Sequence, residues 1–133
     1  MTAGDEVAAA ALATVGARFR PQGRDRALGV DCVGVVAIAL GELALPRDYS
    51  LRCGAWPEVA VPDGMIACDG AATGDVLLCR VSAAQLHLAV RTADGIVHAD
   101  AGLRRVVERP GAVPWPIVAA WRKVGRKVGR KEG

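Results

Sequence analysis

The hydrophobic pattern divides this chain into a helical first third and a strand-rich second half. An alanine-rich segment from Asp5 to about Val15 has acidic residues in its first turn and is followed by Gly16, which is typical of an α-helix. A second apolar run starts at Asp31, a residue type that caps helices, and predicts a helix to about Leu45, before Pro46. Residues 17–29 and 46–73 contain many glycine, proline and charged residues, which predicts loops.

From Val76 onward, apolar runs of strand length alternate with turn residues. The predicted strands are Val76–Val81, Gln85–Arg91, Gly95–Ala99, Arg104–Glu108 and Ile117–Lys123. The intervening turns are Ser82-Ala83, Ala93-Asp94-Gly95, Asp100-Ala101-Gly102 and Pro110-Gly111. Helices followed by consecutive hairpins indicate an α+β fold, in which the N-terminal helices pack on an antiparallel sheet of about five strands.

The charge distribution suggests one folded domain followed by a basic tail. Residues 122–133 hold six of the 17 basic residues and one of the 14 acidic ones, so residues 1–121 keep 11 basic and 13 acidic residues. We therefore expect a domain over 1–121 and a disordered tail over 122–133. The tail could attract polyanions or only aid solubility, and without aromatic residues it is not expected to read nucleic acid specifically.

Several classes of protein are disfavoured by the sequence. No apolar stretch is long enough to span a bilayer, and the acidic start Met1–Glu6 is unlike a secretory leader, so we expect synthesis in the cytoplasm. The four cysteines, Cys32, Cys53, Cys68 and Cys79, show no CxxC pair and no Cys/His spacing of the zinc-site type. Neither a metal nor an organic cofactor is expected.

The candidate chemistry lies in one cysteine and the only two histidines. Cys32 would occupy the first turn of the second helix, where free N–H groups and the helix dipole favour a thiolate. A nucleophilic thiol needs a base, and the base needs an orienting partner, roles that His87 and His98 can fill from neighbouring strands. Period-two alternation sends His87 to the face opposite Leu86 and Leu88, which we expect to be the helix-facing or cleft side.

The pairing of the two histidines depends on the turn between their strands. A hairpin centred near Thr92–Ala93 places His87 directly opposite His98, whereas a tight Asp94-Gly95 turn pairs His87 with Gly102. The catalytic hypothesis needs the longer loop, and the residues alone leave both registers open.

Four motifs resemble, in order, those of the NlpC-type cell-wall peptidases, papain-like cysteine hydrolases that cut the peptide stems of bacterial peptidoglycan. The family's Asp-Cys-Ser-Gly pattern resembles Asp31-Cys32-Val33-Gly34, and its Gly-Asp strand opener resembles Gly74-Asp75. Its His-Val-Gly-Ile-Tyr strand and Val-His-Ala motif resemble residues 87–91 and 97–99. The resemblance reaches from the first helix to about Trp121. It implies Cys32 as nucleophile, His87 as base and His98 as the residue that orients His87.

Two departures from the family pattern concern substrate binding. The family's tyrosine upstream of the cysteine corresponds to Phe19, in the segment Arg18-Phe19-Arg20-Pro21-Gln22, so the hydroxyl is missing and Gln22 is the replacement donor we consider. Val33 replaces a serine that some members use, together with the aspartate, to bind a free amine. Asp31 is therefore either a substrate ligand or a helix cap. Arg18, Arg20 and Arg24 are candidates for binding the stem carboxylates, or form a solvated loop.

The resemblance implies a peptidoglycan endopeptidase that needs no cofactor and cleaves the γ-D-glutamyl–diaminopimelate bond through a thioester. The variant motif and the acidic start resemble the phage-associated branch, whose members are encoded with tail genes in prophages and gene transfer agents. Stem peptides and tail-like proteins are therefore the expected partners, and the cell wall is the expected site of action. Two alternatives stay open: an amidase or acyltransferase on the same fold, and a catalytically weak tail or wall-binding protein.

Overall fold

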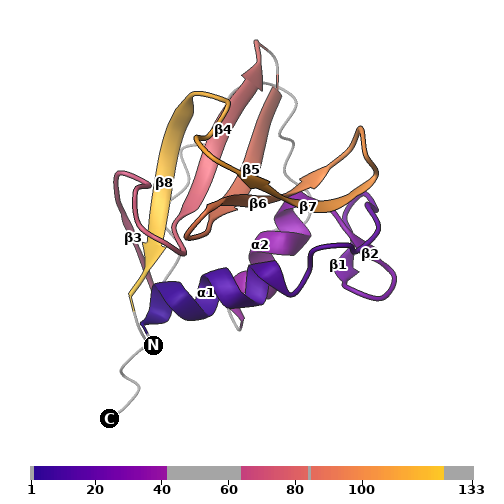
Figure 1. Ribbon diagram of the computed structural model, residues 1–133, viewed down its shortest axis with the longest axis horizontal. Coiled ribbons are helices and arrows are strands. Elements are labelled where there is room, and N and C mark those ends of the chain that lie inside the picture. Colours follow the sequence, from indigo (N-terminus) through magenta and orange to yellow (C-terminus); the bar gives the residue numbers. More distant parts are fainter. Residues whose placement is uncertain (1, 42–63, 84, 125–133) are drawn as a thin grey trace.

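A computed structural model of the protein describes residues 2–41, 64–83 and 85–124, which form two helices and eight strands (Figure 1). The helices are α1 (Ala3–Leu12) and α2 (Cys32–Leu40). The two short strands β1 (Arg24–Asp25) and β2 (Gly29–Val30) pair with each other. The main sheet contains β3 (Met65–Ala67), β4 (Val76–Ser82), β5 (Gln85–Arg91), β6 (Gly95–Asp100), β7 (Arg105–Pro110) and β8 (Ile117–Lys123).

The six-stranded sheet has the order β3-β8-β4-β5-β6-β7, and all its pairs are antiparallel. The α+β prediction and all five predicted strands are confirmed, with ends that differ by at most two residues. The sixth strand, β3, lies in the segment predicted to be a loop. It is three residues long and forms by pairing with β8, so its own sequence carries little signal. Strand β8 also contains Arg122 and Lys123, the first two residues of the predicted tail.

Both helices begin at the capping residues that favour them. Thr2 and Asp5 form a capping box that starts α1, two residues before the predicted start. Helix α2 follows Asp31, whose side chain accepts a hydrogen bond from the N–H of Gly34. It ends at Leu40, because Gly41 takes a positive φ of 75°. The predicted extension to about Leu45 continues into residues outside those described.

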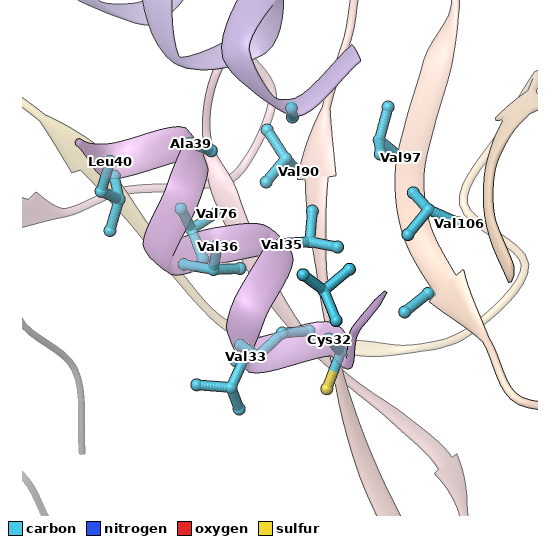
Figure 2. Close-up of a cluster of buried hydrophobic side chains, with 14 of the residues drawn as sticks. Cys32, Val33, Val35, Val36, Ala39, Leu40, Val76, Val90, Val97 and Val106 are labelled. Carbon is cyan, nitrogen blue, oxygen red and sulfur yellow. The ribbon is translucent and has the colours of Figure 1, made fainter. Parts of the chain in front are cut away.

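The sheet carries a hydrophobic core on each face. The helix-side core lies under α1 and α2, and ten of its residues are labelled in Figure 2: Cys32, Val33, Val35, Val36, Ala39, Leu40, Val76, Val90, Val97 and Val106. A smaller far-side core contains Leu77, Cys79, Ala89, Ile96 and Ala120. Alternation along the strands separates the two sets, since Val76 and Leu78 belong to the first core and Leu77 and Cys79 to the second.

The sheet divides between β5 and β6. These strands pair at only two positions, Val90 with Val97 and Arg91 with Ile96. Beyond them β5 continues beside β4, while β6 turns away with β7 (Figure 1). The opening between the diverging strands is called the fork here, and its two sides carry His87 and His98.

Two close associations fix the elements around the fork. The fully buried carboxylate of Asp75, just before β4, accepts two hydrogen bonds from the guanidinium of Arg122 on β8, at 2.8 and 3.0 Å. The first turn of α2 packs so tightly on the preceding loop that a Cβ atom on Gly34 would overlap the carbonyl oxygen of Gly23. Neither described helix is long and apolar enough to cross a bilayer.

Candidate functional site at the fork

Cys32 is the first residue of α2 and is buried at the edge of the helix-side core (Figure 2). Its position is fixed by Asp31, whose carboxylate accepts hydrogen bonds from the N–H groups of Gly34 at 2.8 Å and Gln22 at 2.7 Å. Arg24 approaches the same carboxylate at 3.4 Å. Both oxygens of Asp31 are thus engaged within the chain, which favours the helix cap over the substrate ligand.

Three backbone N–H groups are close enough to the Cys32 sulfur to hydrogen-bond to its thiolate form, those of Leu88, Val33 and Cys32 itself. They lower the pKa of the thiol, but burial acts more strongly in the other direction, and the negative charge of Asp31 adds to it. The net effect raises the pKa of Cys32 to about 12. The resting protein therefore holds a neutral thiol, contrary to the expectation that the helix N-terminus would make a thiolate.

The Leu88 N–H is available because of the fork. Arg91 donates its N–H to Asp75 on the β4 side, whereas Thr92 donates to Gly95 on the β6 side, so even-numbered residues of β5 direct their N–H groups toward β6. The next two pairs in this register, Ala89 with His98 and Leu88 with Ala99, are not formed. Because the strands diverge here, the Leu88 N–H is not used in the sheet and can hydrogen-bond to the Cys32 sulfur.

The two histidines contact each other although they are not opposite one another in the sheet. Nε2 of His87 lies 3.0 Å from Nδ1 of His98. The turn between their strands consists of Ala93 and Asp94, closed by the Thr92–Gly95 hydrogen bond, so both predicted registers were wrong. His87 and His98 are diagonal neighbours, and imidazole rings are long enough to meet across a diagonal. The contact does not require the longer loop.

The face that carries His87 also differs from the expectation. Leu86 and Leu88 belong to the helix-side core, so alternation places His87 on the face that carries the far-side core. Cys32 lies on the other face, and among the described residues no hydrogen bond joins its thiol to either histidine. At the fork, β5 and β6 are no longer hydrogen-bonded to each other, so the sheet does not separate its two faces there.

Burial governs the charge of both histidines. It lowers the pKa of His87 to about 4, with a smaller lowering from His98 and a raising contribution from Asp100. Burial likewise lowers the pKa of His98, opposed by Asp100 and assisted by Arg109. Both rings are neutral at pH 7, which is the state that a general base requires.

Trp115 completes the histidine cluster and was not anticipated from the sequence. Its ring lies 5.5 Å from that of His87 and 5.2 Å from that of His98, edge-on to both. It is held by residues 111–116, the strap between β7 and β8, which crosses the far-side core. A lone tryptophan between two prolines carries no positional signal, because only the three-dimensional fold brings it to the histidines.

The other predicted binding residues surround the start of α2. Phe19 is half-buried and packs against the helix-side core, while Arg20 and Gln22 are exposed. Arg18 is also exposed and forms a backbone bridge with Arg105 of β7. Arg24 is paired with Asp31, which leaves Arg18 and Arg20 as the candidates for binding an anionic ligand.

Cys32, Cys68 and Cys79 are free thiols, and Cys53 lies outside the described residues. Over residues 2–41, 64–83 and 85–124, no three His, Cys, Asp or Glu side chains are grouped so that they could hold a metal ion.

Comparison with solved structures identifies the fold. The chain resembles NlpC2 from Trichomonas vaginalis with a TM-score of 0.70 and 15% sequence identity over 94% of its length. It resembles NlpC1 from the same organism with a TM-score of 0.65 and 16% identity over 92% of its length. The chain spans about half of each of these proteins, 48% and 45% respectively. No family profile and no curated protein sequence matches it.

Proposed function

We propose that this protein, which has an NlpC-type fold, is a cysteine peptidase that cleaves the peptide stems of peptidoglycan. Cys32 is the proposed nucleophile, His87 the base and His98 the residue that orients His87. The observation that carries the proposal is the convergence at the fork. A helix-terminal thiol lies against the backbone N–H of Leu88, and the neighbouring residue, His87, is hydrogen-bonded to a second histidine.

The hydrogen bond between the histidines is compatible with the protonation states that the reaction needs. With Nε2 of His87 donating its proton to Nδ1 of His98, the free lone pair of His87 is on Nδ1. As the Cys32 sulfur attacks the amide carbonyl carbon, Nδ1 takes the thiol proton, a transfer that must pass through the fork because the two groups lie on opposite faces of the sheet. It then gives that proton to the leaving nitrogen as the carbon–nitrogen bond breaks. Water next attacks the thioester carbonyl, releasing the carboxylate product and restoring the thiol.

Backbone N–H groups at the fork would stabilise the negative oxygen of the tetrahedral intermediate. Phe19 has no hydroxyl to offer, so the N–H groups near the Cys32 sulfur, foremost that of Leu88, are the proposed donors. These groups belong to a helix terminus and a strand and need no rearrangement to act. One such donor contributes about 3–4 kcal/mol to the stabilisation of a transition state.

Exposed arginines beside the start of α2 would bind the carboxylates of a stem peptide. The side chains of Arg18 and Arg20 both lie against Gly29, and the backbone bridge places Arg105 beside Arg18. Directly opposite residues of an antiparallel pair share a face, so Arg18 and Arg105 lie on the same side of this edge. Guanidinium groups bind carboxylates in a bidentate manner, which fits the anionic stems.

The deciding experiment is a digest of purified stem peptides analysed by mass spectrometry. The samples are wild type, Cys32→Ala and Cys68→Ala, the last making the same chemical change at a thiol outside the fork. New fragments from wild type and Cys68→Ala, but not from Cys32→Ala, would support the peptidase. The fragment masses would test whether the γ-D-glutamyl–diaminopimelate bond is cut and would reveal an amidase instead. Intact peptides in all three samples would reject hydrolysis.

A second candidate is a catalytically weak protein that uses the fold to bind the wall or a tail-like particle. The raised pKa of the Cys32 thiol and the lack of a hydrogen bond from it to His87 favour this candidate. The variant motif Asp31-Cys32-Val33-Gly34 supports a tail-associated setting for either candidate. Sedimentation with whole peptidoglycan sacculi separates them, because a binder would co-sediment while leaving the stems uncut.

A further inference from the structure

We infer that Trp115 is a positioning residue for the histidine pair, closing its far side against water and holding the two imidazoles edge to edge. The three rings are mutually almost perpendicular, with interplanar angles of 89° between His87 and His98, 89° between His87 and Trp115, and 84° between His98 and Trp115. Each ring thus presents its edge or its face to the other two. This arrangement leaves little freedom for either imidazole to turn.

The strap that holds Trp115 is attached at both ends. The N–H of Gly111 donates to the carbonyl of Asp94 in the β5–β6 turn at 2.8 Å, and the N–H of Arg80 on β4 donates to the carbonyl of Pro116 at 3.0 Å. Between these points Val113 and Trp115 pack against the far-side core. Pro114 and Pro116 fix their own φ angles, so the indole is presented by a restrained backbone.

The position of the indole explains why the histidine pair is shielded on the far side, where His98 is buried and His87 is partly buried. The two imidazoles lie on the face of the sheet that carries the far-side core, so the helices and the helix-side core on the other face do not cover them. The charged or titratable groups that act on the pair are Asp100 and Arg109, while Cys79 pairs with His87 across β4 and β5. Burial outweighs each of these charges in lowering the pKa of both histidines, and Trp115 is the large side chain in ring contact with both.

Because the chain has only two histidines, NMR can follow each of them without interference. The ring Cε1–Hε1 signals are titrated in wild type, Trp115→Phe and Trp115→Ala, with His98→Gln used to assign the two peaks. We expect wild type and Trp115→Phe to show no titration of His87 above about pH 5. In Trp115→Ala water reaches the pair, and the pKa of His87 rises by about one unit or more toward the ordinary value of about 6.5.

The matched control is Val113→Ala, which shortens a side chain that packs on the same core from the same strap but has no ring to pack against the histidines. We expect it to leave both titrations unchanged. An equal shift in Val113→Ala and Trp115→Ala, or unchanged titrations in folded Trp115→Ala, would overturn the inference. Should Trp115→Ala fail to fold, Trp115→Val takes its place, because it keeps an apolar side chain but removes the ring and most of the volume. A His87 pKa as low in Trp115→Val as in wild type would then overturn the inference.

The importance of Trp115 for catalysis rests on the proposed function, but its effect on the histidine titrations does not. If the stem digest succeeds, Trp115→Ala should lower kcat more than it changes KM, and Trp115→Phe should restore most of the loss. If the digest fails while the NMR shifts appear, the peptidase is rejected and the positioning role stands.

Discussion

His87 and His98 are joined at 3.0 Å across a diagonal of the sheet, at the point where β5 and β6 have ceased to pair. Two residues opposite each other in a regular ladder have their backbones linked as well as their side chains. Here the contact between the rings is the link across the fork. The histidine pair therefore holds the two sides of the fork together while leaving the backbone of Leu88 free to approach Cys32.

The first prediction concerns the separate roles of the two histidines. His87→Asn removes the proposed base and should lower kcat about 10²- to 10⁴-fold, as expected for loss of general base catalysis. His98→Ala should lower kcat less, and His98→Gln less again, because an amide can still accept the hydrogen bond from Nε2 of His87. Steady-state kinetics on a stem peptide would measure this order. Equal activity of His98→Ala and wild type would remove His98 from the mechanism.

The second prediction concerns the reactivity of the Cys32 thiol. Since burial raises its pKa to about 12, we expect alkylation by iodoacetamide to be slow at pH 7 and to accelerate about tenfold per pH unit well above pH 9. Cys68, which is partly exposed, should react faster at every pH and serves as the internal standard. Peptide mass spectrometry separates the two sites. A rate at Cys32 that levels off by pH 8 would contradict this, and would indicate a thiolate stabilised as an ion pair.

The third prediction follows from the low pKa of His87. The folded state releases the His87 proton at a pKa of about 4, and the unfolded state at about 6.5. Between these values the unfolded state binds more protons, so the free energy of unfolding falls as the pH decreases from 6.5 toward 4. The slope for one group is at most about 1.4 kcal/mol per pH unit. Urea unfolding of wild type and His87→Phe at pH 7 and pH 5 would reveal it, because the variant lacks this titration and should lose less stability.

The fourth prediction concerns the buried ion pair that ties the start of β4 to β8. Burial tends to raise the pKa of Asp75, but hydrogen bonds from Arg122 and from the N–H of Ala72 outweigh it, and the net pKa is lowered. Arg122→Gln should clearly lower the urea midpoint, because it leaves the fully buried carboxylate of Asp75 without its charged partner, although the arginine side chain itself is 38% exposed. The control is Asp69→Asn. Asp69 lies 3.6 Å from Arg122 but its side chain is 78% exposed, so its loss should cost under about 1 kcal/mol. Similar urea midpoints for the two variants would contradict this ranking.

The parts of the fold that can be predicted from the sequence are those determined by residues close together along the chain. The strands from Val76 onward follow from local alternation and turn residues, and the start of α2 follows from Asp31. Strand β3 depends on β8, a partner more than 50 residues away, and could not be found locally. The residue motifs predict Cys32, His87 and His98 as the candidate residues, but the register between the two histidine strands depends on a turn that differs by one residue from either alternative.

The remaining features of the site depend on tertiary structure alone. The fork exists because β6 follows β7 rather than β5, and no local pattern encodes that choice. Trp115 lies on the strap between β7 and β8, which is not a strand of the sheet, so no strand pairing predicts its contact with the histidines. The raised pKa of Cys32 arises from the depth at which α2 is buried, which a helix-terminus argument cannot supply.

The contact between Gly34 and the carbonyl of Gly23 has a consequence for how this protein can diverge or be redesigned. With no space between helix and loop, the segment bearing Phe19, Arg20 and Gln22 cannot be exchanged for one of another shape while α2 stays in place. This loop and the start of α2, which carries Cys32, must therefore vary together. A chimaera that transplants the loop alone would shift the thiol, whereas one that transplants residues 17–40 as a block would carry its geometry intact.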